Sequence, residues 1–162
     1  MADSWFLKLD GIAGESTDQA HKGEIDVLSW SWGVTQTGAP GGGGGGGAGA
    51  GKAEFHDLFF VTRVSRASPK LILAVATGAH IKTAVLTGTR GSGSGKAADY
   101  LVYRLSDVIV TSVQHGAADG PPTEQVSLRY AKFQVSYRRQ AASGTLEPPV
   151  EAGWDLKANK KV

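Results

Sequence analysis

Residues 124–140 read EQVSLRYAKFQVSYRRQ, and apolar and polar residues alternate through this segment with the period of 2 that marks a half-buried β-strand. The apolar residues occupy even positions up to Tyr130 and odd positions from Ala131 onward. A slip of one residue would turn every later side chain away from the core. We therefore expect a β-bulge near Tyr130–Ala131, which restores the alignment and bends the strand sharply. Such bends are typical of barrels and of orthogonally packed sheets.

The same alternation predicts strands over most of the chain, and hence a mainly β fold. It is clearest over Glu24–Val34, where Leu28, Trp30, Trp32 and Val34 all fall on one face. We expect this segment to be one half-buried strand with an aromatic inner face. The full set of predicted strands is 5–9, 24–34, 55–64, 81–87, 99–115 and 124–140.

One helix is predicted over Ser68–Thr77. Ser68 suits the N-cap, Pro69 suits the first helical position, and Gly78 supplies the left-handed residue past the end. The residues between them, 71–76, are apolar almost all round, which indicates a helix that buries two faces. The second face is covered either by another subunit or by the helix's own barrel, which it would plug. For a subunit contact the candidate residues are Ile72, Leu73 and Ala76.

Glycine is concentrated in one segment. The chain has 162 residues, enough for one domain over 1–162, and 23 of them are glycine. Nine of the eleven residues from Gly41 to Gly51 are glycine, within a predicted extended loop over 37–53. Gly46, Gly51 and Lys52 have the spacing of a phosphate-binding loop, but Ala53 stands where the motif needs the Ser or Thr that holds Mg²⁺. We therefore interpret the segment as a linker.

Nothing in the sequence calls for catalytic chemistry. The chain has no cysteine, which excludes disulfides and thiolate metal sites, and its net charge of +2 comes without a basic cluster for nucleic acid. The four histidines lack the paired spacing of metal ligands, so we expect them at surface or capping positions, with His80 near the helix end. Asp107 is expected near a turn or a strand start. We predict no enzyme, no cofactor and no metal, and we find neither a signal peptide nor an apolar run of membrane-spanning length.

Several motifs, in order, resemble the Hcp family, the inner-tube proteins of bacterial type VI secretion systems. The resemblance spans nearly the whole chain and lies in these segments: 6-FLKLDGI-12, 14-GES-16, 21-HKGEI-25, 29-SWSWG-33, 67-ASPKL-71, 76-ATG-78, 80-HIK-82, 122-PTE-124, 126-VSL-128 and 153-GWDL-156. The family implies a compact β-barrel of two packed antiparallel sheets with one main helix. It also implies six copies in a ring and rings stacked into a hollow tube.

The resemblance further implies partners and a location. The implied partners are other copies of the chain, a contractile sheath, a spike protein and effectors in the lumen, with no membrane insertion. The protein would be cytoplasmic before assembly and exported through the apparatus without a signal peptide. Two other readings stay open: a tube subunit of a related phage-tail-like machine, and, in a different class, an effector, enzyme or monomeric ligand-binding barrel on the same fold.

In a stacked tube the glycine-rich loop is the predicted contact between rings. An extended loop crossing to the next ring can hydrogen-bond its backbone to an exposed strand edge, and glycine offers no steric obstacle to that pairing. The candidate stacking residues are Thr37, Gly38, Gly41, Gly47, Gly51, Lys52 and Glu54.

Overall fold

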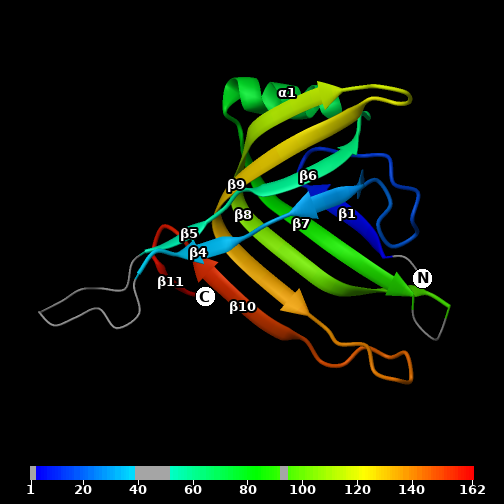
Figure 1. Ribbon diagram of the computed structural model, residues 1–162, viewed down its shortest axis with the longest axis vertical. Helices are drawn as coiled ribbons and strands as arrows, with labels where there is room; N and C mark the ends of the chain where they lie inside the picture. The colour runs from blue at the N-terminus through cyan, green and yellow to red at the C-terminus, as the bar shows by residue number, and fades with distance from the viewer. Residues whose placement is uncertain (1–2, 39–51, 92–94) are drawn as a thin grey trace, which may run out of the picture.

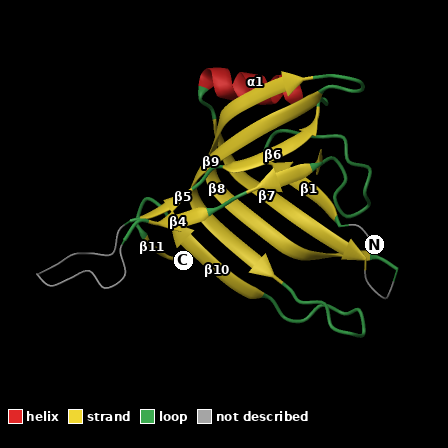
Figure 2. Ribbon diagram, viewed as in Figure 1, coloured by secondary structure: helices red, strands yellow, loops and turns green. Residues whose placement is uncertain are grey.

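The computed structural model describes residues 3–38, 52–91 and 95–162, and this part of the chain is mainly β with one helix (Figures 1 and 2). Antiparallel strands dominate it. In chain order the elements are β1 Ser4–Leu9, β2 Ile25–Val27, β3 Ser29–Ser31, β4 Val34–Gln36, β5 Ala53–Phe55, β6 Leu58–Arg63, α1 Ser68–Thr77, β7 His80–Gly91, β8 Ala97–Gly116, β9 Thr123–Tyr137, β10 Val150–Asp155 and β11 Lys160–Lys161.

The long strands β8 and β9 hold the fold together. They pair with each other almost throughout, while the other edge of β9 changes partner along its length. Its first half, Thr123–Leu128, pairs with β6, and its second half, Lys132–Tyr137, pairs with β10. One nine-stranded sheet therefore runs β11-β10-β9-β8-β7-β1-β2, with β6 and β3 attached at the first half of β9. The hairpin β4–β5 forms a separate two-stranded sheet.

The sheet bends at one level across three adjacent strands. In β7, Ile81 and Ala84 are both buried; in β8, Leu105 and Val108; in β9, Tyr130 and Phe133. Between the two buried residues of each strand lie two whose side chains are not buried: Lys82–Thr83, Ser106–Asp107 and Ala131–Lys132. Each strand thus changes its buried face there by one residue, and Asp107 adopts a left-handed φ of 53°.

The predicted bulge at Tyr130–Ala131 is wrong in one respect. The change of buried face occurs there, but the pairing of β8 with β9 does not shift: Ser106 pairs with Lys132 and Val108 with Tyr130 in one register. Because neighbouring strands contain the same extra residue at the same level, the ladder stays aligned across the bend. The register of this pair shifts instead between Val110 and Ser112.

The expected barrel does not close. Across the described part of the sheet, β2 and β6 share no strand ladder, although the bend brings them together. Two hydrogen bonds join them: the Leu28 amide donates to the Val61 carbonyl at 2.8 Å, and the Thr62 hydroxyl donates to the Asp26 carbonyl at 2.6 Å. The structure is an almost closed, sharply bent sheet around one core.

The predicted strand over Glu24–Val34 is divided into β2, β3 and β4. Ile25 and Val27 are the buried residues of β2, whereas Leu28 is 49% exposed, so the buried face changes at Leu28. Trp30 and Trp32 do face the core side, as predicted. Trp32 stacks on Phe133, with ring centroids 4.3 Å apart. The strand is divided because its first part pairs with β1 and its second with β6.

The helix has the predicted span but a different cap. Its N-cap is Ala67, and Ser68 is the first helical residue. The buried Ser68 hydroxyl accepts a hydrogen bond from the Ser65 amide at 2.9 Å, upstream of the helix. Gly78 is left-handed at φ 65°, as predicted. Leu71 and Ala74 face the core, and α1 lies against one end of the long strands in Figure 1.

Gly88 in β7 is required by close packing, and its replacement tests the fold. A Cβ at this position would lie 2.3 Å from a ring carbon of Trp5, which is itself packed on Trp30 at 5.1 Å. We expect Gly88→Ala to lower the free energy of unfolding by about 1–3 kcal/mol, as overpacking does, measured by urea denaturation. Gly116→Ala is the control, since a Cβ there meets no heavy atom within 4 Å. Equal stability of both variants would contradict this packing.

Candidate assembly surfaces

The outer face of α1 is apolar and uncovered. Ile72 is 49% and Leu73 62% exposed, and neither faces the core. Ala76 is exposed beside them. The helix has no acidic residue in its first turn and no basic residue in its last. All three residues predicted as subunit contacts therefore lie on an accessible surface.

The hairpin β4–β5 is the second exposed element, and in Figure 1 it extends away from the main sheet. Its base is anchored by Phe55, whose ring lies 6.0 Å from that of Phe133. Of the predicted stacking residues, Thr37, Lys52 and Glu54 are exposed, and the Gly38 amide donates to the Gln36 side chain at 3.1 Å. Gly41, Gly47 and Gly51 lie outside the described residues.

The bend of the sheet carries a cluster of charged residues around Asp107. One carboxylate oxygen lies 2.7 Å from Nδ1 of His80, and the other accepts a hydrogen bond from Nζ of Lys157 at 2.9 Å. The hydrogen bond from Lys157, followed by that from His80, lowers the pKa of Asp107 below its ordinary value. This aspartate lies inside β8 rather than near a turn, contrary to our expectation. The sequence signal for this break in the alternation of β8 was the two successive polar residues Ser106 and Asp107.

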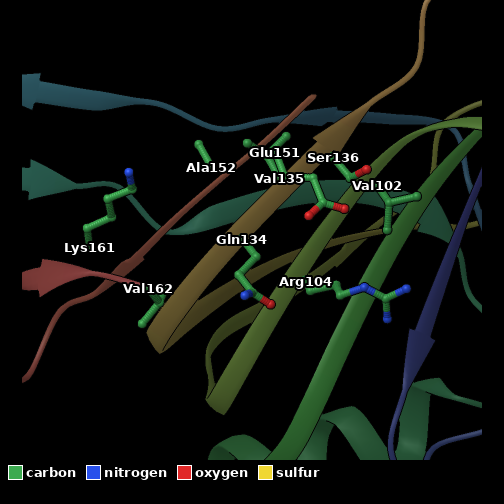
Figure 3. A pocket seen from close by; sticks show the side chains of 9 residues that line it. All are labelled: Val102, Arg104, Gln134, Val135, Ser136, Glu151, Ala152, Lys161 and Val162. Carbon is green, nitrogen blue, oxygen red and sulfur yellow. The ribbon is translucent and has the colours of Figure 1, made fainter. Parts of the chain in front are cut away.

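A shallow groove of about 280 Å³ lies on the open face of β8, β9 and β10 (Figure 3). Arg104 and Gln134 are cross-strand neighbours on its floor, and Glu151 and Lys161 lie at its sides. Val162 packs against Gly153, where a Cβ would come within 2.8 Å of it. The groove mixes charges of both signs with aliphatic groups and contains no arrangement of nucleophile and base.

Three of the four histidines, His21, His80 and His115, lie within hydrogen-bond distance of carboxylates. His115 lies 2.6 Å from one oxygen of the fully buried Glu124, whose other oxygen has no hydrogen-bond partner. His21 is also buried, between Glu24 at 2.9 Å and Asp99 at 2.8 Å, so the expected surface position is wrong for it. Asp99 and Glu124 come from other strands and so were not predictable partners, whereas Glu24 lies only three residues after His21. Within the described residues no group of three or more His, Cys, Asp or Glu is arranged to hold a metal ion.

A bent antiparallel sheet with an exposed apolar helix face and an extended hairpin defines a β-structured protein with two surfaces open to assembly. The profile of the family described as "Type VI secretion system effector, Hcp" matches residues 6–137. The chain therefore belongs to the Hcp family, and it is a tube subunit of a type VI secretion system. The predicted resemblance is confirmed.

Individual relatives agree over the full length. The chain is 41% identical to "Protein hcp1" of Pseudomonas aeruginosa strain PAO1, with 98% of each chain covered. A solved type six secretion system protein superposes with a TM-score of 0.89 at 32% identity, over 99% of this chain and 100% of the other. Hcp1 from Salmonella typhimurium gives a TM-score of 0.81 at 33% identity, with both chains fully covered. No helix in the described residues is long and apolar enough to span a membrane.

His21 makes stability depend on pH. Burial alone would lower its pKa, but the hydrogen bonds and charges of Asp99 and Glu24 outweigh burial and raise the pKa above the ordinary value of 6.5. A raised pKa means that the stabilisation is complete below the unfolded value and is lost as pH rises through the folded one. We expect His21→Gln to cost about 1.5–3 kcal/mol in acid solution, the worth of hydrogen bonds to a charged group.

This cost should shrink in alkaline solution, where wild-type His21 is neutral. Urea denaturation at about pH 5 and about pH 9 measures the difference. His56→Gln is the matched control, since this imidazole is exposed and its substitution should cost little at either pH. A loss for His21→Gln that is independent of pH would refute the charged pair.

Proposed function

We propose that this chain assembles into hexameric rings, which stack into the hollow inner tube and hold effectors in the lumen. The observation that carries the proposal is the outer face of α1, where Ile72 and Leu73 expose apolar surface on a helix whose inner face already covers the core. In a monomer this apolar surface stays exposed to water, whereas in a ring each subunit can bury it against its neighbour. Membership of the Hcp family supports the same arrangement.

The proposal includes the other members of the machine. A contractile sheath would surround the tube, a spike protein would cap it, and the subunit would leave the cytoplasm through the apparatus itself. We propose no enzymatic activity, cofactor or nucleic-acid partner. Size-exclusion chromatography with light scattering tests the ring directly. A particle of six subunits is expected, and a monomer at high protein concentration would overturn the proposal.

The helix contact is tested by Leu73→Lys. A lysine on this face leaves the core contacts of Leu71 and Ala74 intact but places a charge in the proposed interface. We expect a protein with wild-type circular dichroism that elutes as a monomer. Leu73→Met is the control and should keep the ring, because it preserves an apolar side chain of similar volume. A six-subunit particle from Leu73→Lys would show that the helix does not meet a neighbour.

The glycine-rich loop is proposed to join successive rings through its backbone. Replacing Gly41–Gly51 by a two-residue turn should preserve the ring and weaken stacking. Ordering a residue costs about 1–2 kcal/mol, so contacts repeated around a ring are needed to offset it. Tube lengths in negative-stain micrographs measure the effect. A Gly/Ser segment of equal length is the control, and tubes of normal length from the shortened loop would contradict the proposal.

A further inference from the structure

The bend of the sheet leaves a shallow apolar hollow at one end of β10. Its floor consists of Ile109 and Ala131, and Leu156 forms one side. The volume is about 260 Å³, against about 30 Å³ for one water in the liquid, so an aliphatic side chain fits. The hollow exists because Asp107 and Ala131 lie at the bend, where neither strand presents a buried side chain. The Leu156 amide holds its own segment there by donating to the Ala131 carbonyl at 2.8 Å.

The rim of the hollow carries charged side chains. His80, Arg129 and Lys157 surround it, and their side chains are mostly exposed. Asp107 is shared by His80 and Lys157, while Arg129 contacts Asp57 at 3.2 Å. Asp57 and Asp107 therefore balance the charges of Arg129 and Lys157. The side chains of Arg129 and Lys157 remain 65% and 74% exposed, so they can also bind a carboxylate that a partner brings next to an apolar group.

The opposite end of β10 carries a group of that kind. Val150, the first residue of the strand, is 74% exposed, and its cross-strand neighbour Tyr137 is 44% exposed. Glu151 follows directly, is exposed, and forms no ion pair with the described residues. Pro148 and Pro149 precede the strand and restrict the backbone there.

We propose that the Val150–Tyr137 patch of one copy docks into the hollow of a copy in the next ring, with Glu151 beside Lys157. The two surfaces lie at opposite ends of one strand, as Figure 1 shows for the direction of β10, so each copy offers a patch at one end and a hollow at the other. Contacts of this head-to-tail type do not close on themselves, so they propagate along a stack. The hairpin β4–β5 lies at the same end as the hollow, since Phe55 contacts Phe133 and Phe133 pairs with Trp154.

This inference rests on the proposed function, and it concerns stacking alone. The chain has no cysteine, so introduced cysteines report proximity without a background. We expect Glu151→Cys combined with Lys157→Cys to form disulfides between copies under mild oxidation of concentrated protein. Non-reducing electrophoresis should then show a ladder that continues beyond six copies. Each single variant should give no ladder, and Glu151→Cys with Lys70→Cys is the control pair, since Lys70 is also an exposed lysine and lies on α1.

A charge exchange provides a second readout. Glu151→Lys should shorten tubes at least several-fold in micrographs while light scattering still finds the ring, and Glu151→Lys with Lys157→Glu should restore length. Val150→Asp should act like Glu151→Lys, because it removes the apolar group. The inference would be overturned by a ladder that ends at six copies or by cross-links that are equally frequent in the control pair. It would also be overturned if Glu151→Lys and Val150→Asp gave tubes of wild-type length. Failure of the unmodified chain to form rings would instead refute the proposed function.

Discussion

In-register pairing across the bend of the sheet is the constraint on which the structure depends. An antiparallel ladder aligns only if neighbouring strands advance together, and a change of buried face in one strand must be matched by the next. Strands β7, β8 and β9 change face at one level, around Lys82, Asp107 and Ala131. The sheet can therefore turn sharply while Val108 remains paired with both Ile81 and Tyr130.

The bend creates the core and the surfaces together. Because the two halves of β9 pair with different strands, β6 and β10, the sheet folds over itself and encloses a single cluster of aliphatic and aromatic side chains. Short β2 and β3 cover one side, and α1 covers an end. Three features lie outside this core: the apolar outer face of α1, the hairpin β4–β5, and the strand β10, which has an exposed apolar patch at one end and a shallow hollow at the other. These surfaces belong to a tube subunit of the Hcp family.

Ion pairs supply long-range connections in a chain that has no disulfide. His21 connects the N-terminal loop to the start of β8 at Asp99, and Arg90 binds Asp3 through two nitrogen atoms. Glu124 is buried at the start of β9 against His115. A buried carboxylate with an unsatisfied oxygen is costly. It lies at the turn end of the β8–β9 hairpin, where His115 is its partner.

The sequence alone determined the fold class, the helix and the position of the phase change at Tyr130–Ala131, because the period of 2 residues and the Pro and Gly boundaries of the helix are local properties. It also carried the family, through motifs spread along the chain. Only the tertiary structure decided that the phase change is shared by adjacent strands, that Glu24–Val34 divides between β1 and β6, and that Asp107 meets Lys157. Those outcomes depend on which strands, distant in sequence, become neighbours in the sheet. The sequence pattern indicates which face of a strand a side chain lies on, but not which strand pairs beside it.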